Sequence, residues 1–459
     1  MRWTMTWLGL MVGCHAEDPS VGTQAPPVPP TSAGPPIAID LDAAPNIVLI
    51  TIDTLRADRL KLHGNTRETA PAISALATQG VTFMDAVAPA PWTLPTLASI
   101  HSSLYPSEHS VIGAKTRLNN SVETLAETLR RAGYRTIGVV SNRFASTNYG
   151  MAQGFDDFDD SQIVGHHDLS SAGLTRIAVE KLGKGDGPPV FLWVHYFDPH
   201  FTFVRHPQFG FADGYTGQFG DQISNADVRD AFNNGGVSDE DVAYAKNVYD
   251  EEIAFTDKWI GELLDTESLQ GPRKQLTVLT ADHGEYFMER GRFFHGEDVY
   301  WELVHVPLII AGDIEPSLVG SRVADTVSLT SIPATIMSHL GIADHSFKGV
   351  DLLGDKTARQ TTPVFAEGSH LWGRGNQNKA VITPSWKLIH TPATGKLELY
   401  NRTTDPTEKD NVYDGKLAPE IQVLQTRLDG FPASAATAPE EAETSPETIR
   451  QLEALGYVE

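Results

Sequence analysis

The sequence predicts an α/β fold in which a mixed, mostly parallel sheet is sandwiched by helices and is followed by a smaller antiparallel α+β subdomain. Short apolar runs alternate with stretches of helical periodicity, which is typical of a sheet covered on both faces. The chain has 459 residues, of which 41% are hydrophobic, enough for a large core. The expected strands are residues 46–52, 135–140, 190–196, 276–281 and 306–310.

Two helices are expected between these strands. The first, residues 121–132, begins after the cap signal Asn120-Ser121 and is followed by Gly133, a stop signal. Residues 238–268 form a long crossover helix, because their apolar residues recur on roughly one helical face. Those residues are Val242, Val248, Ile253, Phe255, Trp259 and Leu263.

The chain changes character near its C-terminus. Short strand-like runs joined by turn-rich links predict an antiparallel meander, so residues 45–370 are assigned to the main domain and 371–459 to a second subdomain. Residues 432–446 are rich in Ala, Pro, Glu and Thr and are expected to form a mobile strap. A last helix is expected from Ser445-Pro446 to Gly456.

The N-terminus has the features of an export signal. Arg2 precedes a short apolar run that ends at Gly13-Cys14, so residues 1–13 resemble a bacterial lipoprotein signal and residues 14–44 a Pro- and Ser-rich tether. The run is too short to span a bilayer as a mature helix. We expect export and anchoring to a membrane through lipidated Cys14, facing the periplasm or the cell exterior. A plain secretory signal or a misplaced start codon is the alternative.

Charge and cysteine usage exclude several classes of protein. The net charge of -24 and the lack of a long basic block argue against a nucleic-acid partner. Cys14 is the only cysteine, which excludes an intramolecular disulfide and a cysteine-rich metal site.

Metal-ligand side chains follow two of the expected strands. Asp53 ends the first strand, and Asp282-His283 end the fourth. Groups at the carboxyl ends of parallel strands share one crevice, so these side chains can surround one divalent cation.

Five segments, taken in order, resemble the sulfatase branch of the alkaline-phosphatase superfamily. They are residues 50–58 (ITIDTLRAD), 91–99 (PWTLPTLAS), 105–109 (YPSEH), 195–200 (HYFDPH) and 280–285 (TADHGE). The similarity covers residues 45–459. The resemblance implies an α/β sheet between helices, a metal at the strand ends and a nucleophile at the amino end of a helix facing the metal.

The resemblance also assigns metal ligands and shows where this chain departs from the family. Asp53 stands where the metal-binding acidic pair of the family begins, but Thr54 replaces the second acid. Asp282 and His283 match the second ligand pair, and an imidazole favours Zn²⁺ or Mn²⁺, with Ca²⁺ possible. The alternative role for Asp53 is to cap the next helix.

Thr93 occupies the position that typical sulfatases use for a Cys or Ser oxidised to formylglycine. Formylglycine chemistry is excluded because no cysteine lies outside the signal, Thr is not a precursor, and Leu97 replaces the usual Arg. Thr93 resembles instead the nucleophilic and metal-binding Thr of phospho-transferring members of the superfamily. The alternative is an ordinary helix cap.

Further site residues are assigned by the same resemblance. His200 matches a histidine near the leaving group, and His295 falls near the Lys or His that touches the transferred group. A solvent-facing loop histidine is the alternative for His200. The Lys and His that usually complete the sulfate clamp are absent after the strand ending near Ser141, and Asn142 or Arg143 are candidates to replace them.

Together these residues predict a metal-dependent ester hydrolase or transferase. Phospho- or phosphono-esters are favoured over sulfate esters, because water must cleave a Thr ester and a phosphoryl group offers the metal more charge. The substrate is a small molecule, a glycan or a lipid headgroup. The alternatives are a sulfatase without formylglycine and a non-catalytic lipoprotein that binds anions or carbohydrate.

Overall fold

The computed structural model describes residues 34–163, 170–185, 187–354, 356–368, 377–416, 418–431 and 437–443. The expected signal, Cys14 and the expected terminal helix lie outside these residues. The end of the expected tether already lies against the domain, because the Ile37 N–H donates to the Arg131 carbonyl at 3.0 Å. Among the described residues, no helix combines the length and the apolar character needed to cross a membrane.

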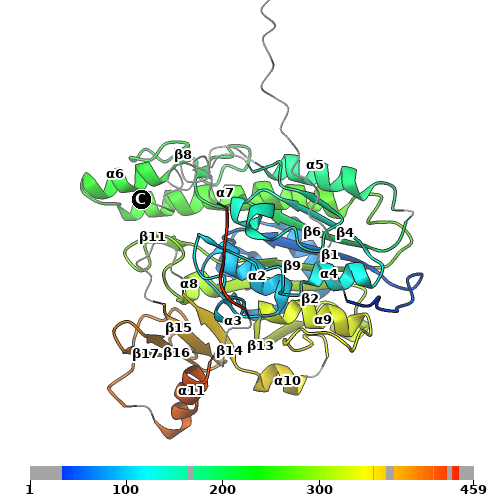
Figure 1. Cartoon of the computed structure of the whole chain (residues 1–459). Coiled ribbons are helices and arrows are strands. Elements are labelled where there is room, and N and C mark those ends of the chain that lie inside the picture. Colours follow the sequence, from blue (N-terminus) through cyan, green and yellow to red (C-terminus); the bar gives the residue numbers. More distant parts are fainter. Residues whose placement is uncertain are drawn as a thin grey trace, which may run out of the picture.

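An eight-stranded sheet forms the centre of the molecule (Figure 1). β1, β4, β5, β6 and β9 run parallel, whereas β12 is antiparallel to both β9 and β2. In spatial order the strands are β13 (Arg322–Ser328), β2 (Gly80–Val87), β12 (His305–Gly312), β9 (Gln275–Ala281), β1 (Asn46–Ile52), β6 (Val190–Tyr196), β4 (Arg135–Val140) and β5 (Asp157–Asp159).

All five expected strands are confirmed. The expectation missed β2, β5 and β13. Asp85 interrupts the apolar run of β2, and its charge is paired with Arg402. Within the sheet β13 pairs with β2 alone, at the edge, and four of its seven residues are partly or fully exposed, so it carries little apolar signal.

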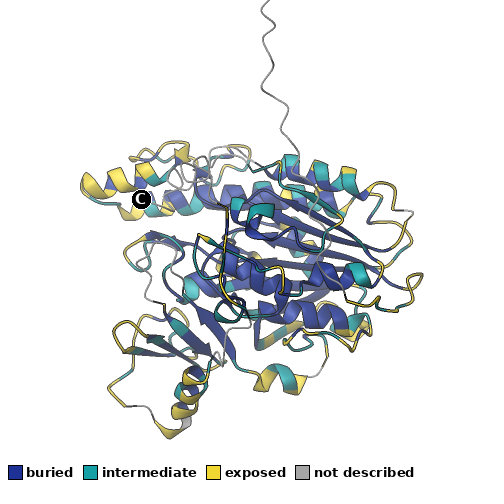
Figure 2. Ribbon diagram, in the orientation of Figure 1, coloured by how far each residue is buried: buried dark blue, intermediate teal, exposed yellow. Residues whose placement is uncertain are grey.

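Helices cover both faces of this sheet (Figure 1). One layer contains α1 (Pro71–Thr78), α5 (Ser171–Leu182) and α7 (Asp239–Leu264), and the other contains α2 (Thr93–Ser102), α4 (Leu125–Arg131) and α9 (Ile332–His339). Figure 2 shows the sheet between them as almost wholly buried. Two apolar layers on a parallel sheet therefore leave its strand ends as the place where polar groups gather.

Both predicted helices form, with differences at their ends. α7 fills most of the predicted range and begins where the Ser238 side chain accepts the Asp241 N–H. α4 begins at Leu125 rather than at residue 121, because Thr124 and Glu127 form a reciprocal capping box.

The predicted antiparallel C-terminal sheet is present. It contains β14 (Val364–Glu367), β15 (Lys379–Ile382), β16 (Trp386–Thr391) and β17 (Lys396–Asn401), and α11 (Pro419–Asp429) packs on it. β14 precedes the expected boundary at residue 371. Part of the expected mobile strap is paired, because β18 (Glu440–Glu441) joins β3 (Thr116–Arg117).

The remaining elements lie in the connections. They are α3 (Pro106–His109), β7 (Phe203–Val204), β8 (Gln222–Ile223), α6 (Asn225–Asn233), β10 (Tyr286–Phe287), β11 (Phe293–Phe294), α8 (Trp301–Val304) and α10 (Lys356–Thr361), with short 3₁₀ turns such as η3 (Arg143–Ala145).

Candidate active site

The carboxyl ends of β1 and its neighbours β6 and β9 meet at one edge of the sheet. Asp53 follows β1, and its N–H donates to the Tyr196 carbonyl of β6 at 2.9 Å. The next N–H, from Thr54, donates to Oδ1 of Asp282 after β9 at 3.1 Å. Asp53 and Asp282, predicted as ligands from distant segments, thus lie close together at this edge of the sheet.

Asp53, Asp282 and His283 form a cluster suited to a metal ion. One ligand atom from each lies within 4.8 Å of the others. Nε2 of His283 lies 3.5 Å from Asp53 Oδ1 and 3.5 Å from Asp282 Oδ2. All three side chains are fully buried. The structure therefore brings together three of the four predicted metal ligands around a common point.

The hydrogen bonds of this cluster fit a bound cation. The His283 Nδ1–H donates to the Gly284 carbonyl at 2.9 Å, which leaves the Nε2 lone pair facing the two carboxylates. In the described part of the chain, Asp53 Oδ1 and Asp282 Oδ2 are buried without a hydrogen-bond partner. Buried acceptors without donors are costly, and a divalent cation is a group that would satisfy both atoms.

Electrostatics lead to the same conclusion. Burial raises the pKa of Asp53 to about 7. Burial and the neighbouring Asp53 charge raise the pKa of Asp282 well above its usual range. Burial lowers the pKa of His283 well below its usual range. Two buried carboxylates therefore repel each other here, and a bound cation would lower the pKa of both carboxyl groups and keep His283 neutral.

Thr93 is the first residue of α2, and its hydroxyl faces the cluster. The N-cap of this helix is Trp92, and no side chain caps the helix, so the interpretation of Thr93 as an ordinary cap is wrong. Thr93 Oγ1 lies 3.4 Å from His283 Nε2. The fourth predicted metal ligand is thus adjacent to the other three.

Asn142, whose role the sequence left open, lies inside the site. Its Oδ1 accepts the Phe144 N–H at 2.7 Å, which turns its amide nitrogen toward the cluster. That nitrogen donates to Asp53 Oδ2 and lies 3.5 Å from Thr93 Oγ1. Arg143 follows it in η3.

The two predicted acid–base histidines continue from the cluster as a row of rings. The His295 ring centroid lies 4.3 Å from that of His283 and 5.1 Å from that of His200. Nδ1 of His295 lies 3.1 Å from a carboxylate oxygen of Glu285. His200 is 4% exposed, so its interpretation as a solvent-facing histidine is wrong.

Burial disfavours the charged form of His295, but the negative charges of Glu285, Asp53 and Asp282 together outweigh this effect, and the pKa of His295 is raised above its usual value. Glu285 belongs to the family-like segment 280–285, but the sequence alone assigns it no role. Its position three residues after Asp282 was the only signal for it. The structure identifies it as the partner that favours the imidazolium form of His295.

Two more residues of the family-like segments, His195 and Arg56, lie at or near the site. His195, on β6, directs Nε2 toward Asp53 Oδ2 at 3.6 Å. Arg56 binds Asp58 through two hydrogen bonds and donates to the Glu285 carbonyl at 2.8 Å. The Arg56 side chain is 7% exposed and that of Asp58 is 54% exposed, so the pair joins a buried guanidinium to a carboxylate at the surface. Thr54, which replaces the second acid, has a φ of 56°, and its buried hydroxyl has no partner among the described residues.

Comparisons with known proteins identify a family. A family model described as Sulfatase matches residues 45–342, more than half of the chain. An arylsulfatase of Clostridium perfringens is 24% identical over 84% of this chain and 96% of its own length. A choline-sulfatase of Rhizobium meliloti is 25% identical over 83% of this chain and 85% of its own length.

Solved structures share the fold. A phosphonate monoester hydrolase of Agrobacterium radiobacter superposes with a TM-score of 0.65 at 20% identity, covering 85% of this chain and 95% of that one. The family match, the shared architecture and the metal-ligand cluster at the strand ends lead to one conclusion. The chain belongs to the sulfatase family of ester hydrolases, within the alkaline-phosphatase superfamily.

Proposed function

We propose that this protein is a metal-dependent hydrolase or transferase that cleaves phospho- or phosphono-esters through Thr93. The observation that carries the proposal is the hydroxyl at the first position of α2, 3.4 Å from the lone pair of His283. The start of a helix also offers free backbone N–H groups that can stabilise an anion.

Asp53, Asp282 and His283 would hold the divalent ion, and Thr93 would complete the set. Zn²⁺ or Mn²⁺ is favoured because one ligand is an imidazole, and Ca²⁺ is the alternative. When bound, the cation supplies the positive charge that lowers the pKa of the Thr93 hydroxyl and stabilises charge on the transferred group.

Thr93 then acts as the nucleophile. Its Oγ1 loses its proton to solvent and forms a bond to phosphorus, while the bond from phosphorus to the leaving-group oxygen breaks. His295, kept protonated by Glu285, or His200 beside it, donates a proton to that oxygen. Water then attacks the phospho-threonine, the bond to Oγ1 breaks, and the Thr93 hydroxyl is restored.

The reacting residue favours phosphorus over sulfur. A formylglycine hydrate can expel sulfate by reverting to the aldehyde, whereas a Thr ester must be broken by water at the transferred group. A phosphoryl group offers more negative charge for a cation to stabilise than a sulfuryl group does. The likeness to arylsulfatase and choline-sulfatase sequences keeps sulfate esters as the alternative substrate.

Parallel kinetics test this proposal. Rates with Zn²⁺ or Mn²⁺ are measured on nitrophenyl sulfate, nitrophenyl phosphate, bis-nitrophenyl phosphate and nitrophenyl phenylphosphonate. Thr93→Ala should abolish turnover of every ester, and Thr93→Ser should keep part of it. Unchanged turnover by Thr93→Ala would remove this residue from the mechanism. Faster turnover of the sulfate than of the phosphorus esters would assign the enzyme to sulfate.

We also propose that the protein is an exported lipoprotein anchored through Cys14. Support comes from the short apolar run before this single cysteine and from the Pro-rich residues after it. In a bacterial host, the full chain should appear in the membrane fraction with a lipid-modified N-terminus. Cys14→Ser should prevent that modification, and an unmodified wild-type N-terminus would contradict the proposal.

A further inference from the structure

His195 lies beneath the metal cluster, in a buried chain of polar side chains that the proposed mechanism does not use. Thr51 on β1 pairs in register with His195 on β6. Side chains two residues apart on a strand share a face, so Thr51 and Asp53 lie together, as do Trp193 and His195. Thr51, Trp193 and His195 are all 0% exposed.

The hydrogen bonds of this chain have a direction. The indole of Trp193 can only donate, and it donates to Thr51 Oγ1 at 3.0 Å. The Thr51 proton has two acceptors in reach: Nδ1 of His195 at 2.9 Å and the Val194 carbonyl at 3.5 Å. The shorter contact assigns the proton to Nδ1 of His195, so the ring carries its own proton on Nε2.

That Nε2–H is aimed at the metal site. It lies 3.6 Å from Asp53 Oδ2 and has no hydrogen-bond partner among the described residues. The same carboxylate oxygen accepts the Asn142 amide, while Oδ1 faces His283. A small rotation of the carboxylate would bring Oδ2 within hydrogen-bond distance of His195 and leave Oδ1 as the ligand atom.

We propose that Trp193, Thr51 and His195 form a buried relay that positions the Asp53 carboxylate for metal binding, with Thr51 selecting the tautomer of His195. The proposal rests on the proposed metal site. His195 is a positioning residue, acting through Asp53 and not on the substrate. Outer-shell hydrogen bonds of this kind typically change metal affinity by roughly 10- to 100-fold.

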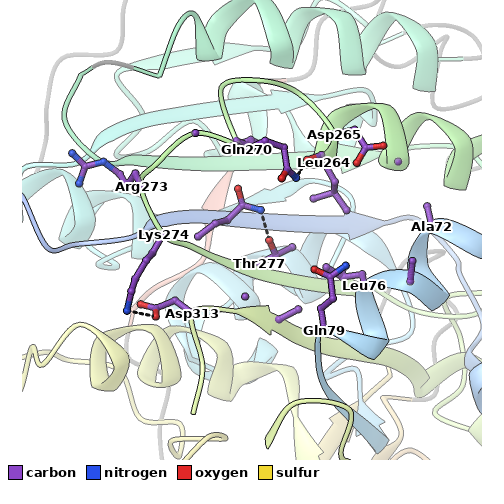
Figure 3. A pocket seen from close by; sticks show the side chains of 17 residues that line it. Ala72, Leu76, Gln79, Leu264, Asp265, Gln270, Arg273, Lys274, Thr277 and Asp313 are labelled. Atoms are coloured by element: carbon purple, nitrogen blue, oxygen red, sulfur yellow. Dashed lines mark hydrogen bonds and ion pairs between the residues drawn. The ribbon is translucent and has the colours of Figure 1, made fainter. Parts of the chain in front are cut away.

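Thr51→Val is the informative variant, because it keeps the shape of the side chain and removes only the hydroxyl. The matched control is Thr277→Val. Thr277 is also buried on a strand, and its hydroxyl accepts Gln275 Nε2 at 2.7 Å. It lies toward the amino end of β9, beside a separate cavity of about 540 Å³ (Figure 3). Thr51→Ser, which keeps the hydroxyl, is the rescue variant.

The dissociation constant for Zn²⁺ is measured by competition with a chromophoric chelator, alongside the melting temperature of the metal-free protein. Thr51→Val and His195→Leu should weaken Zn²⁺ binding by roughly tenfold or more, while Thr51→Ser and Thr277→Val bind as the wild type does. Wild-type affinity in folded Thr51→Val and His195→Leu proteins would overturn the relay. Because affinity is measured without substrate, the result is independent of whether Thr93 acts as a nucleophile.

A second measurement addresses the tautomer directly. In the ¹⁵N-histidine spectrum of the metal-free protein, the signals lost in His195→Leu should show a protonated Nε2 and an unprotonated Nδ1. In Thr51→Val this preference should disappear. An unprotonated Nε2 in the wild type would overturn the assignment of His195 as a donor to Asp53.

Discussion

Nε2 of His283 lies 3.5 Å from Oδ1 of Asp53, although the two residues follow different strands, β9 and β1. The imidazole presents a lone pair, because its Nδ1–H is held by the Gly284 carbonyl. A lone pair that faces a buried carboxylate without a proton between them is repulsive. The contact is favourable once a cation lies between them, and this property of the site leads to the first prediction.

Asp282→Asn should abolish metal binding and also stabilise the metal-free protein. The substitution removes a ligand charge, but it also removes one of two buried carboxylates that repel each other. Metal content after dialysis and the melting temperature in a chelator measure the two effects. Asp257→Asn is the control and should leave metal content unchanged, because that buried carboxylate accepts the Ala72 and Ile73 N–H groups and no other donor among the described residues. A metal-free Asp282→Asn protein that melts below the wild type would contradict this account.

His295→Ala should slow the enzyme most on substrates with poor leaving groups. A proton donor contributes little when nitrophenolate is the leaving group and much when an alkoxide is. The loss of rate should therefore be small for nitrophenyl esters and about 10²- to 10⁴-fold for alkyl esters. Glu285→Gln should show the same trend more weakly, because it removes the charge that favours the imidazolium. Rates on a series of aryl and alkyl esters check this. An equal loss across the series would rule out a proton-donor role.

The pH dependence of stability should reveal the buried His101. Burial lowers the pKa of this ring from 6.5 to about 3. Below pH 6.5 the His101 ring therefore binds a proton in the unfolded chain but not in the folded one. The free energy of unfolding falls as the pH drops from 6.5 toward 3. One such group contributes up to about 1.4 kcal/mol per pH unit.

His101→Phe keeps an aromatic ring against Trp193, 4.3 Å away, and cannot take up a proton. Urea denaturation at several pH values between 4 and 7 should give a smaller loss of stability for this variant than for the wild type. Identical slopes for the two proteins would show that His101 titrates normally.

Lys387 and Glu408 form an ion pair whose side chains are both 0% exposed, with Nζ and Oε1 2.9 Å apart. Glu408 also accepts the Trp301 N–H, which links the C-terminal sheet to the segment after His295. Lys387→Met leaves a buried carboxylate without its partner and should cost about 3–5 kcal/mol of stability. Lys387→Met/Glu408→Gln should recover part of this loss in denaturant titrations. A double variant less stable than Lys387→Met would argue against an unpaired charge as the cause.

Sequence reasoning predicted the parts of this structure that carry local signals. Residues 46–52 and 276–281 are mostly apolar runs, as is typical of a buried parallel strand, and the predicted metal ligands follow each run directly. Thr93 was assigned by the resemblance of residues 91–99 to the family motif, and Pro95, which indicates a helix start, supports that placement. β13, whose first four residues are exposed or half-buried and whose last three are buried, has no comparable pattern.

The rest of the site depends on contacts that no local pattern encodes. Asn142 follows β4, and the pairing of β4 with β6 brings it to the site. Its amide is oriented by the Phe144 N–H, which donates to Oδ1. His195 lies within an apolar strand, and the sequence alone does not distinguish it from an ordinary buried core histidine. That Thr51 lies beside His195 follows only from the pairing register of β1 and β6. Strand pairing, rather than composition, therefore decides which polar side chains reach the metal.

The most direct test of the central claim is a crystal structure of the Zn²⁺- or Mn²⁺-loaded protein with vanadate, recorded at the absorption edge of the metal. We expect one metal peak bonded to Asp53, Asp282 and His283, and vanadium within bonding distance of Thr93 Oγ1, with His295 or His200 beside an outer oxygen. A metal bound elsewhere, or vanadate held away from Thr93, would contradict it.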